Sequence, residues 1–147
     1  MNRWTQATQA ERRLWVKLLL GLIRAGRAGD DESVVLTFHI IGRALGADAV
    51  VSSLHYLAER AASPWLPDDG LVYAVEIEGA DGERLDIDDV PYPLRWSARM
   101  IAAAANGDYE IQQALVTAAL DDERLDACVP VLTQMAASVP VMTAGGI

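Results

Sequence analysis

Two histidines that flank a glycine are the residues best placed to bind a metal. His39 and His55 stand seven residues before and nine residues after Gly46. Two antiparallel helices joined at this glycine could bring the imidazoles close together, with Glu59 as a neighbouring carboxylate. A zinc site needs three or four protein ligands at defined spacing, and H-E-x-x-H or any comparable motif is missing from the sequence. We therefore predict ordinary histidines and no metal.

Acidic residues are dense between positions 81 and 89, which raises the question of a calcium loop. An EF-hand loop requires oxygen ligands at its positions 1, 3, 5 and 12 and a glycine at position 6. No aspartate of the segment begins a loop with that spacing. The acids alternate instead with Leu85 and Ile87, which predicts a strand with one solvated face.

The sequence contains no pattern typical of a catalytic centre. Cys128 is the only cysteine, so an internal disulfide is excluded, and no basic residue stands next to it to activate the thiol. Nucleophile-elbow, P-loop and dinucleotide-binding glycine motifs are missing. We predict a protein that is not an enzyme, with no catalytic residue, no cofactor and no metal.

Hydrophobic periodicity predicts three helices in the first part of the chain, over residues 8–25, 33–45 and 48–62. Thr8 and Glu11 form a capping-box pattern at the start of the first, and Asp48 is the expected N-cap of the third. Apolar side chains cover about two-thirds of the first helix, since each residue turns it by about 100°. This helix is therefore expected to be either the central helix or half of an oligomer interface.

A two-residue alternation over 71–78 and 84–88 predicts two half-buried strands. A three-residue loop ending at Gly82 would pair Ile77 with Leu85 and Glu78 with Arg84. Three more helices are expected over 94–105, 108–120 and 122–137. The predicted fold class is mainly α, with six helices and one two-stranded antiparallel β-hairpin. It forms a single domain over 1–147, with helix-helix-helix-hairpin over 8–89 and a C-terminal helical part over 93–138.

The order of these elements, with the string IGRALG at 41–46 followed by Val50, Leu54 and Leu57, resembles a winged helix-turn-helix domain. The resemblance makes Gly46 the turn, 48–62 the recognition helix and 71–89 the wing, and it implies DNA binding. The charges differ from that family. Acids crowd the wing and would repel phosphate, and the exposed positions of the recognition helix would be Ala49, Ser52, Ser53, His55, Tyr56, Glu59 and Arg60. The resemblance therefore concerns the fold.

Composition describes a globular chain with an uneven distribution of charge. The 147 residues are 52% hydrophobic and carry a net charge of −9. Residues 1–27 hold six bases and one acid, whereas residues 68–89 hold nine acids and one base. Such a chain can pair head to tail with itself. No segment approaches the roughly 20 apolar residues that span a bilayer. We therefore expect no membrane contact and a cytoplasmic protein.

We predict a non-catalytic, acidic protein-interaction or assembly module that binds a protein partner and forms a homo-oligomer. The excess of arginine over lysine is typical of high-GC bacterial (actinobacterial, for example) and phage genomes. The alternatives are a winged-helix DNA-binding regulator, and an acidic module that mimics nucleic acid to capture a basic protein. Exposed aromatics, the first helix and the acidic strands supply the interface candidates, which are Trp4, Trp15, Leu19, Ile23, Trp65, Asp86 and Asp88.

Overall fold

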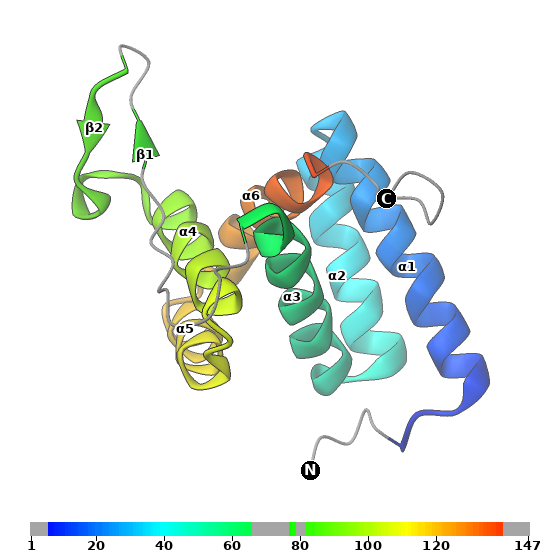
Figure 1. The fold of residues 1–147 in the computed structure, drawn as a ribbon. Helices are drawn as coiled ribbons and strands as arrows, with labels where there is room; N and C mark the ends of the chain where they lie inside the picture. Colours follow the sequence, from blue (N-terminus) through cyan, green and yellow to red (C-terminus); the bar gives the residue numbers. More distant parts are fainter. Residues whose placement is uncertain (1–5, 66–76, 79–81, 140–147) are drawn as a thin grey trace.

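The computed structural model describes residues 6–65, 77–78 and 82–139. This part of the chain contains the predicted number of α-helices, six, drawn in Figure 1. They are α1 (Gln9–Ala28), α2 (Asp31–Leu45), α3 (Ala47–Ala62), α4 (Tyr92–Ala105), α5 (Tyr109–Asp121) and α6 (Leu125–Ala137). Two short 3-10 helices, η2 (Ser63–Trp65) and η3 (Ile87–Asp89), flank the stretch between α3 and α4. Among the described helices, none is both long and apolar enough to cross a membrane.

Local side-chain caps start several of these helices. The capping box of α1 is confirmed: the Glu11 amide donates to Thr8 Oγ1 at 3.1 Å, and the Thr8 amide donates to Glu11 Oε1 at 3.0 Å. Asp30 accepts from the Ser33 hydroxyl at 2.6 Å and from the Ser33 amide at 3.2 Å. These two bonds lower the pKa of Asp30. Because Asp30 is the cap, α2 begins two residues before the predicted start.

The start of α3 differs from the prediction. Gly46 is its N-cap, with φ at 95°, and no side chain caps the helix. Asp48 lies in the first turn instead, where a carboxylate still interacts favourably with the positive end of the helix dipole. A left-handed φ is strained for residues with a Cβ, so Gly46 fixes both the end of α2 and the angle at which α3 leaves it.

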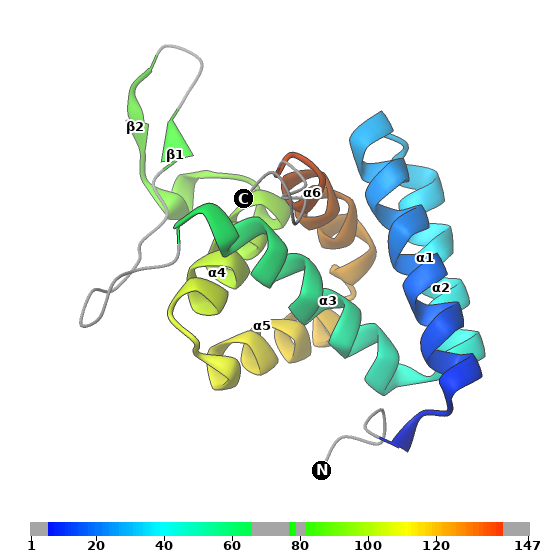
Figure 2. The same ribbon diagram turned by 45° about the vertical axis from the view of Figure 1, so that its right-hand side comes forward.

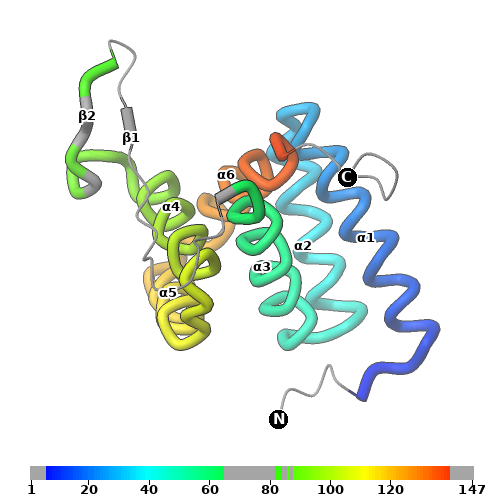
Figure 3. Tube along the Cα trace, viewed as in Figure 1, coloured from blue at the N-terminus to red at the C-terminus, as the bar shows by residue number. Residues whose placement is uncertain are grey.

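The central helix of the structure is α6, which packs against each of the other five helices. Figure 2 shows α6 between the α1–α2 pair and the group formed by α3, α4 and α5. No charged residue occurs in α6 after Asp126, so most of its circumference can be buried. The predicted central position of α1 is wrong. This helix lies at the edge of the molecule, against α2 and α6, as the tube view in Figure 3 also shows.

The helices α1 and α6 approach each other closely at Gly26. A Cβ atom placed on this glycine would lie 2.8 Å from Thr133 Cγ2 and 3.0 Å from the Thr133 carbonyl oxygen. Both distances are shorter than van der Waals contact. The absence of a side chain at Gly26 therefore sets how near the edge helix lies to the central one.

The predicted fold class is wrong in its β part, because helices alone build the described fold. Among the described residues, antiparallel pairing is limited to two residues on each side, β1 (Ile77–Glu78) and β2 (Arg84–Leu85). These residues pair in the predicted register, but Ile87 begins a 3-10 helix where a strand was expected. The rest of the first predicted strand, 71–76, lies outside the described residues. An isolated two-stranded ribbon is marginal in water without a third strand or a covering helix.

The winged-helix arrangement expected for the N-terminal half is also not found. The helix α3 packs against α2, α4 and α6, and only part of its circumference faces outward. Ala49 and Ser53, predicted to be exposed on the recognition helix, are fully buried. The short strand pair lies near α4, away from α1 and α2, in Figures 1 and 2. The apolar pattern that resembles a recognition helix therefore serves core packing.

Candidate functional site

The predicted interface residues on α1 lie mostly inside the fold. Leu19 and Ile23 are 6% and 8% exposed and belong to the core. Trp15 is half-buried and donates its indole Nε1–H to Ser53 Oγ at 2.8 Å. Among the large apolar side chains of α1, the two most exposed are their neighbours Val16 and Leu20, at 49% and 52%. The unusually wide apolar face was the sequence signal for these two residues.

The remaining interface candidates are only partly described. Trp4 lies outside the described residues, and Trp65 ends η2, with its side chain outside them as well. Asp86 accepts a hydrogen bond from the Asp88 amide at 3.1 Å, and Asp88 Oδ1 lies 3.3 Å from Arg99 Nη2. Both carboxylates thus brace the turn that leads into α4. The nucleic-acid mimic stays a prediction.

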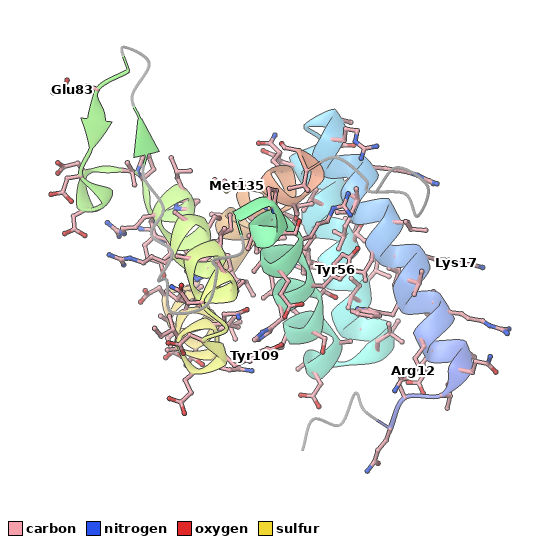
Figure 4. All side chains as sticks on the ribbon, in the orientation of Figure 1. Arg12, Lys17, Tyr56, Glu83, Tyr109 and Met135 are labelled. Atoms are coloured by element: carbon pink, nitrogen blue, oxygen red, sulfur yellow. The ribbon has the colours of Figure 1, made fainter. Side chains whose placement is uncertain are left out.

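An exposed stripe of basic and aliphatic side chains runs along α1. Its members are separated by three or four residues and lie within about 100° of the helix circumference. We call this surface the α1 stripe; it consists of Arg13, Val16, Lys17, Leu20, Arg24 and Arg27. In the part of the chain that is described, its basic residues form no ion pair. Figure 4 shows Lys17 pointing away from the other helices.

Two adjoining hollows of 600 and 480 Å³ lie along α2 and α6, and we call them the α2–α6 groove. His39 and Asp126 line both hollows, with His39 Nε2 3.0 Å from Asp126 Oδ1. The lining is otherwise aliphatic and acidic, and no lysine or arginine contributes to it among the described residues. Its acids are Asp31, Glu32, Glu123 and Asp126, and its exposed aliphatic side chains are Leu36 and Leu120.

A third hollow, of 330 Å³, crosses the outward face of α3, and we call it the α3 groove. Its walls come from α1 on one side and from the start of α5 on the other. Figure 4 places Tyr56 on the α1 side of α3 and Tyr109 on the α5 side. The lining residues are Trp15, Val51, Ser52, His55, Tyr56, Glu59, Tyr109 and Gln113.

Aromatic contacts fix the geometry of the α3 groove. The ring of His55 stacks on Tyr109 with centroids 5.4 Å apart and planes 22° apart. Tyr56 meets Trp15 edge to face at 6.4 Å. The Tyr109 hydroxyl donates to Glu59 Oε1 at 2.9 Å, and this bond raises the pKa of Tyr109. The groove is therefore an aromatic surface with one carboxylate held at its edge.

Sequence reasoning named part of this groove and missed the rest. His55, Tyr56 and Glu59 were expected on the exposed face of their helix, where their chemistry differs from that of a DNA-reading helix. Tyr109, fifty residues after Glu59, was not singled out. The only sequence signal for Tyr109 is its position directly after Asp108. Asp108 is the N-cap of α5, and its carboxylate accepts a hydrogen bond from the Ile111 amide.

His55 occupies a poorly satisfied position. Its two ring nitrogens and Gln112 Oε1 are buried and have no hydrogen bond of good geometry among the described residues. Burial lowers the pKa of His55, while the Glu59 carboxylate and the nearby Gln112 amide act in the opposite direction. The imidazole is therefore neutral at pH 7.

The lowered pKa of His55 makes stability depend on pH. In the unfolded chain His55 has an ordinary pKa near 6.5, whereas in the folded chain its pKa is lowered. Protonation of His55 therefore favours unfolding. We expect the free energy of unfolding to fall as the pH drops from about 7.5 to about 5.5, across the histidine range. Urea unfolding at each pH measures this decrease. His55→Gln should make this decrease smaller; an unchanged decrease in this variant would contradict the assignment.

The structure does not bring the two histidines to one site. His39 lies in the α2–α6 groove and His55 in the α3 groove. Within the described residues, no group of three or more histidine, cysteine or acidic side chains could hold a metal ion. Cys128 is buried, and burial raises its pKa to about 11. The thiol is therefore protonated at neutral pH and is a weak nucleophile.

Comparisons with protein-family models, with curated proteins and with solved structures gave no match to this chain. Its function has to be argued from these surfaces alone.

Proposed function

We propose that this protein is a self-associating interaction module, in which the α1 stripe of one copy docks into the α2–α6 groove of a second copy. The observation that carries the proposal is the complementary character of the two surfaces. The stripe presents four bases and two aliphatic side chains, and the groove presents four acids and exposed leucines.

Dimensions and composition support this pairing. From Arg13 to Arg27 the stripe extends about 21 Å, at 1.5 Å per residue of helix. Val16 and Leu20 lie one turn apart, so they can enter an apolar trough together while the flanking bases face carboxylates at its edges. Apolar contacts of this kind supply affinity, and complementary charges supply orientation and association rate.

The charge distribution favours a polypeptide over a nucleic acid as the partner. The outward face of α3, where DNA recognition was considered, carries the carboxylates of Asp48 and Glu59. The net charge of the chain is −9, so its surface outside the α1 stripe repels polyanions such as nucleic acids. A second copy of the chain is attracted instead, because the carboxylates of its α2–α6 groove are opposite in charge to the bases of the stripe.

Charge reversal tests this docking. Lys17→Glu in the stripe and Glu32→Lys in the groove each place like charges opposite each other. We expect each variant to raise the dissociation constant of the self-associated complex at least tenfold, which corresponds to about 1.4 kcal/mol. An equimolar mixture of the two variants should associate again, because the unchanged stripe of the Glu32→Lys variant can dock into the unchanged groove of the Lys17→Glu variant. Light scattering coupled to size exclusion, at about 100 μM chain, detects micromolar association of this kind.

Charge changes outside both surfaces serve as controls. Arg43→Glu and Glu110→Lys have the same charge changes at exposed positions on α2 and α5, and we expect them to associate like the wild type. Added salt should weaken the wild-type complex, because the Debye length falls from about 10 Å at 0.1 M to about 3 Å at 1 M. A wild-type monomer throughout, or salt-sensitive binding of duplex DNA that requires Lys17, would overturn the proposal.

A further inference from the structure

We infer that the α3 groove is a binding site for a guanidinium group, namely an arginine side chain presented by a partner peptide. This site is separate from the surfaces proposed to mediate self-association. Its lining comes from α3, one side of α1 and the start of α5, and it shares no lining residue with the α2–α6 groove or with the α1 stripe.

The shape and the lining of the groove suit a flat cation. Three kinds of aromatic ring, from Trp15, the two tyrosines and His55, border a space of 330 Å³, which is large enough for one long side chain. A guanidinium near the face of an aromatic ring is attracted by the negative potential of its π electrons. Because the rings are packed in pairs, as stacked His55–Tyr109 and edge-to-face Trp15–Tyr56, they are held in place before any ligand arrives.

The charge of the groove is negative. Glu59 is the one acid in its lining, and no lysine or arginine of the described chain lines it. The Tyr109 hydroxyl holds the carboxylate at the rim through Oε1. His55 adds no positive charge at pH 7, since burial keeps the imidazole neutral. A cation entering the groove therefore meets one fixed carboxylate and no competing cation.

Another tyrosine of this protein shows the same chemistry already satisfied. The guanidinium groups of Arg95 and Arg124 both lie over the ring of Tyr92, with Cζ atoms 5.5 and 5.4 Å from its centroid. Its hydroxyl donates to Asp122 at 3.3 Å. The α3 groove repeats the tyrosine, with its hydroxyl on a carboxylate, but the chain supplies no arginine there among its described residues. The arginine that the described chain does not supply in the α3 groove is the group that we assign to the partner peptide.

Guanidinium fits this arrangement better than ammonium. Its plane can lie along an aromatic ring while its N–H groups form a fork toward a carboxylate. A lysine ammonium is a compact, strongly hydrated charge, and the groove is too open to remove its water. We therefore expect an order of preference in which arginine is bound more tightly than lysine, and neutral citrulline is not bound.

The test uses N-acetyl-argininamide as the probe and wild-type protein in two-dimensional NMR. We expect saturable shifts at His55, Tyr56 and Glu59 and at the Trp15 indole, with a dissociation constant of about 1–10 mM, because single exposed cation–π contacts and hydrogen bonds are weak. Glu59→Gln should weaken binding at least fivefold. Tyr109→Phe keeps the ring but loses the hydroxyl that holds Glu59, so it should weaken binding less than Tyr109→Ala, which should bind at least fivefold more weakly.

N-acetyl-citrullinamide has nearly the same shape without the charge, and N-acetyl-lysinamide has the charge without the plane. Equal binding of the citrulline probe would overturn the need for a cation, and equal or tighter binding of the lysine probe would overturn the preference for guanidinium. Shifts that do not saturate, or saturable binding unaffected by Glu59→Gln, would overturn the site. Self-association of Glu59→Gln should equal that of the wild type, so failure of this inference and failure of the docking proposal are separate results.

Discussion

Replacement of Trp96 by alanine is expected to lower the free energy of unfolding by about 3–5 kcal/mol, the range for deleting a large buried aromatic side chain. Trp96 on α4 is 2% exposed, and its indole N–H donates to the Leu115 carbonyl of α5 at 2.8 Å. The substitution leaves a cavity between the two helices and removes a hydrogen bond worth about 1 kcal/mol. Urea unfolding followed by circular dichroism measures the loss.

Two further variants separate the contributions. Trp96→Phe keeps a ring in the core and loses the N–H donor, so we expect a smaller loss than for Trp96→Ala. Ile40→Ala removes an exposed aliphatic side chain on α2 that lies outside the α2–α6 groove, and we expect a change within about 0.5 kcal/mol, as for ordinary surface positions. If Trp96→Ala cost less than about 1 kcal/mol, far below the range for a buried tryptophan, the packing of α4 on α5 would be contradicted.

Two glycines of α1 are expected to respond in opposite directions to the same substitution. Gly21→Ala should raise the free energy of unfolding by about 0.5–1 kcal/mol, because alanine is the better helix former. A Cβ atom at this position has nothing within 4 Å. Gly26→Ala should lower it by about 1–2 kcal/mol, because overpacking against Thr133 outweighs the gain in propensity.

The clash at Gly26 has a flexible part and a rigid part. Thr133→Ser removes the methyl group that would lie 2.8 Å from the new Cβ, and leaves the carbonyl oxygen at 3.0 Å. We therefore expect the double variant to recover part of the loss of Gly26→Ala, relative to Thr133→Ser alone. Chemical denaturation of the four proteins gives this coupling. A stabilising Gly26→Ala would show that α1 and α6 are not in close contact at this position.

The helices and two of the helix starts could be predicted from the sequence because they depend on interactions between residues close together in the chain. Six helices follow from their periodicity. The starts of α1 and α5 follow from Thr8, Glu11 and Asp108, whose side chains bond to amides three residues away. The strand prediction failed in the described residues because alternation indicates a half-buried strand only where another element covers the apolar side, which local sequence does not decide. In the part of the chain that is described, pairing is limited to β1 and β2, and Ile87 begins a 3-10 helix.

The candidate site could be predicted only in part. His55, Tyr56 and Glu59 share one helix face, so the sequence alone places them together. Tyr109 joins them because α4 and α5 fold back over α3, and no pattern within either helix contains that information. Leu19 and Leu20 on α1 are equally apolar in sequence, yet one is buried and the other exposed.

The amino-acid sequence by itself determined the helices, the caps of α1 and α5 and the uneven charge, because each depends on residues within about one turn of helix or on composition. Tertiary structure alone decided that α6 is central, that α1 lies at the edge with its bases outward, and that a groove crosses α3. The physical reason is that helix docking depends on how side-chain surfaces far apart in the chain fit each other. Small residues such as Gly26 decide that fit, and their importance becomes visible only when the opposing helix is in place.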